Sequence, residues 1–158
     1  MKVERTANST TERSQTVPAN PGRILALDLG KRRIGLALSD ALGITAQGLE
    51  TLERSNIRAD LAQLTRIVSE HNVSRILIGY PLHMSGQEGR QAEHARDFGA
   101  RLQAATGLSV EFWDERLTTV EAQRVLRQSG ISIEKRAKAV DRLAAVILLE
   151  SYLDSHRL

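Results

Sequence analysis

Two apolar segments near the N-terminus constrain the fold of this chain most strongly. Residues 23–29 and 33–39 both have the composition of buried strands, and Gly30 begins the short turn between them. A connection this short joins antiparallel neighbours, because parallel strands need a crossover of a dozen residues or more. The first segment also contains a carboxylate, Asp28, which must find donors or a cation if it is buried.

The remaining pattern alternates between strands and helices, which predicts an α/β protein with a mixed sheet and helices on its faces. A helix is expected after Asn56, which caps it, and a second helix should end at Gly107. The expected further strands cover about 44–52, 75–79 and 108–113, and two last helices cover about 118–128 and 140–153, separated by a basic loop.

Length and composition exclude several classes of protein. The 158 residues predict a polar, disordered tail over 1–22 and a single domain over 23–158. The chain has no cysteine, so disulfides, thiolate metal sites and cysteine nucleophiles are excluded. Because no apolar stretch approaches a membrane span and no signal peptide is visible, we expect a cytoplasmic protein without membrane contact.

Acidic residues lie at the ends of two of the predicted strands and near the start of the last predicted helix. They are Asp28, the pair Asp114 and Glu115, and Asp141. Ligands gather at the carboxyl ends of parallel strands, so these carboxylates are candidates for one site binding Mg²⁺ or Mn²⁺. Neighbouring side chains on a strand point to opposite faces, so only one of Asp114 and Glu115 should face that site.

Each acid also has a purely structural interpretation. Asp28 could accept hydrogen bonds from the amides of the following turn, and the Asp114–Glu115 pair could be solvated beside a helix cap. Asp141 could stabilise a helix N-terminus through the helix dipole. Taken one at a time, none of these residues shows whether its role is structural or catalytic.

Basic residues accompany the acids and are candidates for contact with phosphate. A basic turn flanked by Gly30 and Gly35 could hold a phosphate on its backbone N–H groups, and solvated helix faces are the alternative for the later residues. His83 and His94 are better explained as surface residues than as metal ligands. The candidate nucleic-acid-binding residues are Lys31, Arg32, Arg33, Arg116, Lys135, Arg136, Lys138 and Arg142.

Four ordered motifs resemble those of the YqgF family, also described as RuvX-type Holliday junction resolvase homologues. They begin at Asp28-Leu29-Gly30-Lys31, Gly79-Tyr80-Pro81-Leu82, Asp114-Glu115-Arg116-Leu117 and Lys138-Ala139-Val140-Asp141, and they span about residues 23–154. The chain departs from the family pattern at Tyr80, where leucine is usual, and at His83, where asparagine is usual.

The resemblance implies a ribonuclease-H-like fold with a mixed five-stranded sheet and helices on both faces. It also implies a divalent-metal nuclease that matures the 5′ end of 16S rRNA in the cytoplasm. By this resemblance Asp28, Glu115 (favoured over Asp114) and Asp141 would be the catalytic, metal-binding residues, with Mg²⁺ or Mn²⁺ as the cofactor.

Three alternatives to a pre-16S rRNA nuclease remain open from the sequence. The same chemistry could resolve four-way DNA junctions, which requires a dimer because two strands are cut symmetrically. A non-catalytic RNA-binding factor could retain the fold, although the intact set of acids argues against it. An actin-like ATP-binding protein would need a second such domain. The expected partner is therefore structured RNA or branched DNA, bound by a monomer or a homodimer.

Overall fold

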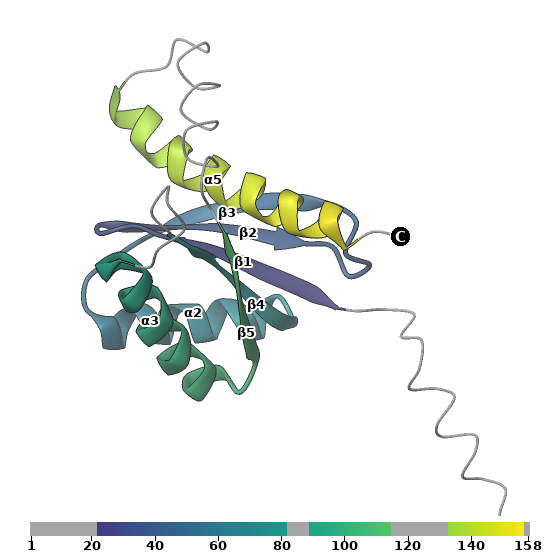
Figure 1. Cartoon of the computed structure of the whole chain (residues 1–158), viewed down its shortest axis with the longest axis horizontal. Coiled ribbons are helices and arrows are strands. Elements are labelled where there is room, and N and C mark those ends of the chain that lie inside the picture. The colour runs from purple at the N-terminus through teal and green to yellow at the C-terminus, as the bar shows by residue number, and fades with distance from the viewer. Residues whose placement is uncertain (1–21, 82–88, 115–132, 157–158) are drawn as a thin grey trace, which may run out of the picture.

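The computed structural model describes residues 22–81, 89–114 and 133–156, which form one five-stranded sheet with helices against it (Figure 1). The strand order is β3-β2-β1-β4-β5. Antiparallel pairing joins β3, β2 and β1, while β1, β4 and β5 run parallel. The strands are β1 (Arg23–Leu29), β2 (Arg33–Ser39), β3 (Ala46–Glu53), β4 (Val73–Tyr80) and β5 (Ser109–Asp114).

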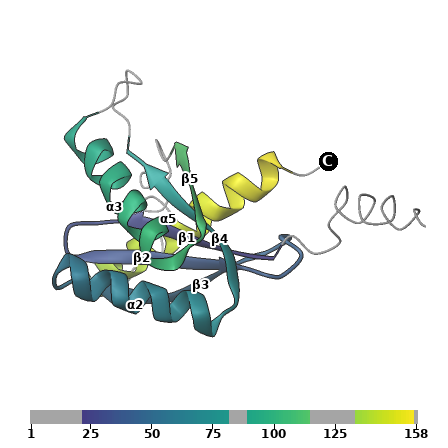
Figure 2. The same ribbon diagram turned by 90° about the horizontal axis from the view of Figure 1, so that it is seen from below.

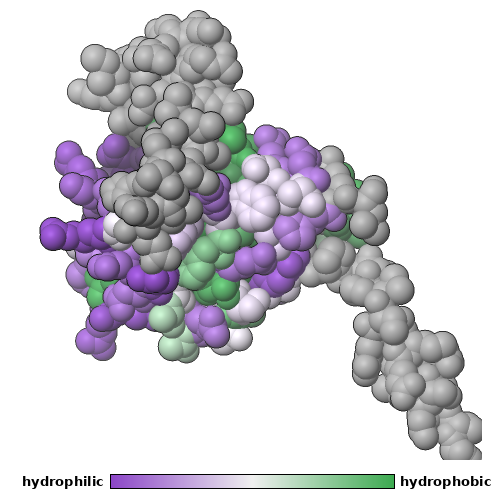
Figure 3. Space-filling model, in the orientation of Figure 1, coloured by the Kyte–Doolittle hydropathy of each residue, from purple (hydrophilic) through white to green (hydrophobic). Residues whose placement is uncertain are grey.

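Helices cover both faces of the sheet, as predicted. Helices α2 (Ile57–Glu70) and α3 (Arg90–Thr106) lie against one face, and α5 (Ile133–Ser155) lies alone against the other within the described residues (Figures 1 and 2). The space-filling view shows a mostly hydrophilic surface with smaller hydrophobic areas (Figure 3). The described part of the chain has no helix that is both long and apolar enough to cross a bilayer.

The side chains of strand β1 show why helices pack on both faces of the sheet. Its side chains alternate in direction, so Leu25 and Leu27 enter the core beneath α2 and α3, whereas Ile24 and Ala26 enter the core beneath α5. All four residues are almost completely buried. A strand with this apolar pattern on both faces is stable only in the middle of a sheet covered on each side.

The predicted strand 23–29, strand 33–39 and helix caps are confirmed. The Asn56 side chain accepts a hydrogen bond from the Ala59 N–H at 2.9 Å, which caps α2. Gly107 ends α3 with φ of 77°, a left-handed conformation that glycine adopts without strain. Strand β3 begins at Ala46 rather than Ile44, because the Asp40 carboxylate accepts bonds from the N–H groups of residues 44 and 45.

The prediction of a basic loop before the last helix is wrong. Helix α5 begins at Ile133, so Lys135, Arg136 and Lys138 belong to its first two turns. The physical reason is that residues 133–139 are good helix formers, with neither glycine nor proline among them. The predicted tail, apart from Gly22, and the predicted helix over 118–128 lie outside the described residues.

Candidate active site

Asp28 lies at the carboxyl end of β1 on the face of the sheet that α5 covers. Side chains alternate between the two faces along β1, so the Asp28 side chain points to the same face as those of Ile24 and Ala26. Both of those residues pack beneath α5. The antiparallel register pairs Asp28 with Gly35 of β2. Any group above Gly35 on this face is therefore a neighbour of the Asp28 carboxylate.

The group above Gly35 is the backbone of Asp141. A Cβ added to Gly35 would lie 2.5 Å from the Asp141 carbonyl carbon and 3.2 Å from its Cα, so α5 rests directly on β2. Gly48 of β3 allows a similar approach, because a Cβ there would lie 2.6 Å from Cγ of Arg142. The structure thus brings Asp28 and Asp141 to one face, although they are far apart in the sequence.

An ion pair fixes the Asp141 carboxylate within this site. The Arg33 Nε donates a hydrogen bond to Asp141 Oδ2 at 3.0 Å, and the two side chains are 22% and 23% exposed. Burial raises the pKa of the Asp141 carboxyl, and the hydrogen bond and charge of Arg33 oppose that rise. Asp141 is therefore a partly buried carboxylate whose ionised form is stabilised by the neighbouring Arg33.

Asp141 does not stabilise a helix N-terminus. Helix α5 begins at Ile133, more than two turns earlier, whereas the favourable effect of the helix dipole is limited to the first turn. The close approach to the sheet, aided by the buried Ala144 and Ala145, accounts for its position. The alternative structural interpretation of Asp141 is therefore wrong.

Asp114 is the last residue of β5 and pairs with Tyr80 of β4, so it also lies at the carboxyl ends of the parallel strands. Phe112 belongs to the core beneath α2 and α3, and Trp113 packs beneath α5. The alternation therefore assigns Asp114 to the face opposite Asp28. Glu115 lies outside the described residues. Among the residues that the structure describes, no three His, Cys, Asp or Glu side chains gather closely enough to hold a metal ion.

The residues predicted to contact phosphate differ in their exposure and in their hydrogen-bond partners. Lys31 and Arg32 are exposed in the β1–β2 turn, and Arg142 is exposed on α5. Arg33 instead bonds Asp141, a partnership that nothing in the sequence indicated. The Gly30 N–H, proposed as part of a phosphate cradle, donates to the Arg33 carbonyl at 2.9 Å. Arg116 and the side chains of Lys135, Arg136 and Lys138 lie outside the described part of the structure.

Curated bacterial proteins are similar to this chain over most of its length. A protein of Koribacter versatilis (strain Ellin345) is 55% identical over 84% of this chain and 87% of its own length. A protein of Myxococcus xanthus (strain DK1622) is 46% identical over 85% of this chain and 89% of its own length. Both carry the name "Putative pre-16S rRNA nuclease".

Solved structures of two resolvases share the fold. T. thermophilus RuvC in complex with a Holliday junction substrate matches 85% of this chain and 96% of its own, with a TM-score of 0.54 and 11% identity. The fowlpox virus resolvase with Holliday junction DNA matches 84% of this chain and 97% of its own, with a TM-score of 0.52 and 15% identity.

These likenesses confirm the predicted ribonuclease-H-like fold. The sequence model of RuvX, described as Holliday junction resolvase, matches residues 22–155. This chain belongs to the RuvX family.

Proposed function

We propose that this protein is a divalent-metal-dependent nuclease that cuts phosphodiester bonds in precursor 16S rRNA, in the cytoplasm. The names of the curated relatives and the membership of the RuvX family support this function. The structural observation that carries it is the packing of the Asp141 backbone on Gly35, the register partner of Asp28. This packing supports the proposal because it puts Asp28 and Asp141 on the same face near the carboxyl end of β1, and enzymes with such sheets bind their ligands at the carboxyl ends of the strands.

The metal ligands would be Asp28, Asp141 and Glu115. Carboxylate oxygens are hard ligands that suit Mg²⁺ or Mn²⁺, and the partly buried Asp141 is already paired with the positive charge of Arg33. We favour Glu115 over Asp114 because the alternation of β5 assigns Asp114 to the other face. When bound, divalent metal supplies activation of water and stabilisation of the leaving oxygen.

The protein's own residues would orient the substrate and the acids. Arg33 holds the Asp141 carboxylate in one position through a charge-assisted hydrogen bond. Lys31 and Arg32 are exposed in the turn after β1, and the exposed Arg142 follows Asp141 on α5, so these three residues would contact phosphates of the substrate. Such contacts set the register of the RNA but do not read its sequence.

The test is cleavage of precursor 16S rRNA by the full chain in Mg²⁺, Mn²⁺ or EDTA. We expect cleavage that requires metal and is lost in Asp28→Asn and Glu115→Gln, because each removes a ligand. Asp114→Asn is the matched control and should cleave normally. Normal cleavage by Asp28→Asn would exclude the proposed site, and loss in Asp114→Asn alone would reverse the assignment of the third ligand.

A second candidate function is the resolution of four-way DNA junctions, which the description of the RuvX family favours. Symmetric cutting of a junction needs two active sites and hence a dimer. The same assay should therefore include a synthetic junction, with the oligomeric state measured by sedimentation. Junction cleavage by a dimer, with no cleavage of RNA, would replace the first proposal by this one.

A further inference from the structure

A cavity of about 390 Å³ opens at the carboxyl edge of β1 and β4, on the side of the sheet that α2 and α3 cover. Its walls come from the β1–β2 turn, the start of α2, the end of β4 and the first half of α3. The described residues that the inference uses are Lys31, Arg54, Ile57, Gln91, His94 and Phe98. This cavity is separate from the site between the sheet and α5.

The cavity nevertheless adjoins the proposed catalytic edge. Leu29 and Gly30, which line it, follow Asp28 directly in the chain. Gly79, another lining residue, lies one position beyond the Leu27–Ile78 pair of the parallel register and so beside Asp28. The cavity and Asp28 thus lie on opposite faces of the sheet but at the same ends of β1 and β4, so a nucleic-acid strand that crosses these strand ends would reach both.

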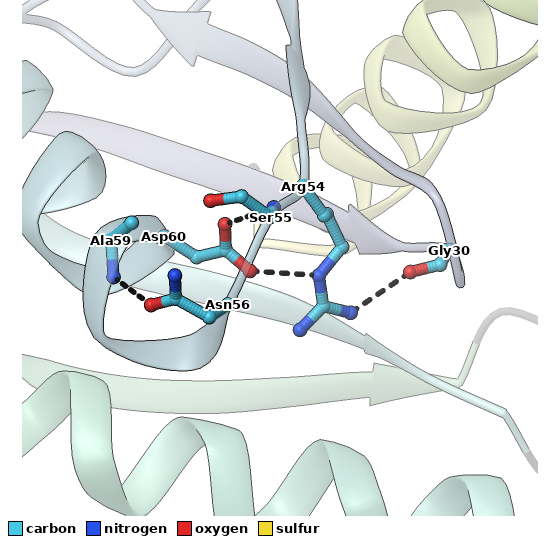
Figure 4. A network of polar contacts seen from close by, with 6 residues as sticks. All are labelled: Gly30, Arg54, Ser55, Asn56, Ala59 and Asp60. Atoms are coloured by element: carbon cyan, nitrogen blue, oxygen red, sulfur yellow. Dashed lines mark hydrogen bonds and ion pairs between the residues drawn. The ribbon is translucent and has the colours of Figure 1, made fainter.

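One wall of the cavity is an arginine that the fold holds in a fixed orientation (Figure 4). Arg54 donates from Nε to Asp60 Oδ2 at 3.1 Å and from Nη1 to the Gly30 carbonyl at 2.9 Å. Asp60 is 1% exposed and also accepts the Ser55 N–H at 3.1 Å. The guanidinium carbon lies 5.4 Å from the centroid of the Phe98 ring. The guanidinium plane is thus positioned before any ligand arrives.

We propose that this cavity binds one unpaired nucleotide of the RNA strand, next to the bond that the enzyme cuts. The inference rests on the proposed nuclease function. Unpaired bases stack on guanidinium planes as well as on aromatic rings, and Arg54, which lies over the buried Phe98 ring, supplies such a plane here. Ile57, which is 37% exposed, adds an apolar surface, and the exposed Lys31 suits the phosphate of the same nucleotide.

Polar side chains at the cavity suit the hydrogen-bonding edge of a base. Gln91 and His94 are exposed residues on successive turns of α3, and together they offer both donors and acceptors. The volume lies near the lower end of the range for small-ligand sites, about 300–1,000 Å³, which suits one nucleotide rather than a base pair. The enzyme should therefore prefer a cut beside an unpaired residue, because a paired base must first leave its helix.

The experiment is photo-crosslinking of single-stranded RNA that carries 4-thiouridine, with EDTA present so that no cleavage occurs. The crosslinked peptides of the full chain are mapped by mass spectrometry. We expect a crosslink within residues 91–98 of α3. The double variant Gln91→Ala/His94→Ala should lower its yield and weaken binding of the RNA about tenfold. Glu93→Ala, an exposed change on the same turn, is the control and should do neither.

A cleavage series separates this inference from the proposed function. RNAs with one abasic residue at successive positions near the cut should be cleaved about tenfold more slowly at a single position, and the double variant should lose that difference. A nuclease that cleaves the whole series equally and crosslinks outside 91–98 would overturn the cavity proposal alone. A protein that cleaves nothing, yet crosslinks through α3, would overturn the nuclease and retain a nucleotide site.

Discussion

Replacing Gly35 with alanine should impair cleavage more than the loss of stability explains. The new Cβ would lie 2.5 Å from the Asp141 carbonyl carbon, whereas ordinary contact begins at 3.4 Å. Since the obstacle is backbone, α5 must move outward by about 1 Å, and a displacement of that size can cost on the order of 100-fold in rate. The overpacking itself should cost about 1–3 kcal/mol in the free energy of unfolding.

The assay combines urea denaturation with the rate of RNA cleavage at saturating metal. Gly99→Ala is the matched control, because its Cβ would lie 2.7 Å from Cζ of Phe112 on the opposite face of the sheet. That variant should lose stability but keep its cleavage rate once folded. If folded Gly35→Ala cleaves as fast as folded Gly99→Ala, the packing of α5 on β2 does not position the catalytic carboxylates.

Two further predictions concern stability rather than catalysis. Asp60→Ala should cost about 3 kcal/mol, because the carboxylate is buried and its loss leaves Arg54 without its counter-ion; Asp97→Ala, which removes an exposed ion pair, should cost less than about 0.5 kcal/mol in the same urea titration. Burial raises the pKa of the Tyr152 hydroxyl above its ordinary value of 10.0, so stability should be complete below about pH 10 and then fall with rising pH, as the unfolded chain ionises first. Tyr152→Phe should reduce the dependence of the unfolding free energy on pH in this range by up to about 1.4 kcal/mol per pH unit. An unchanged dependence would show that Tyr152 is not the group responsible.

The sheet could be predicted well because its strands carry local signals. The bounds of β1 and β2 follow from apolar runs interrupted at Gly30, and the ends of α2 and α3 follow from Asn56 and Gly107. Each of these signals lies within a few residues of the feature that it specifies. Local sequence patterns were therefore enough to predict the order of strands and helices. The lengths of the connections were enough to predict which neighbouring strands are parallel and which are antiparallel.

The geometry of the candidate site depends on contacts between distant residues, which no local pattern reveals. The sequence predicts a phosphate-binding turn flanked by Gly30 and Gly35, but in the structure the missing side chain of Gly35 makes room for the Asp141 backbone. The bond from Arg33 to Asp141 and the ion pair of Arg54 with Asp60 arise only after the sheet and helices have packed. The start of α5 differs from the prediction for another reason: a run of basic residues suggests a solvated loop, whereas the helix propensity of these residues favours helix.

We propose that Asp28 and Asp141 together form one cation site, and a titration with Mn²⁺ would test this proposal. Free Mn²⁺ is counted by its paramagnetic resonance signal as it is titrated into the full chain and into Asp28→Asn and Asp141→Asn, with Asp97→Asn as the control. We predict that the wild-type chain and the control bind Mn²⁺ equally and that each of the other two variants binds it at least tenfold more weakly. Wild-type affinity in Asp141→Asn would contradict a shared site.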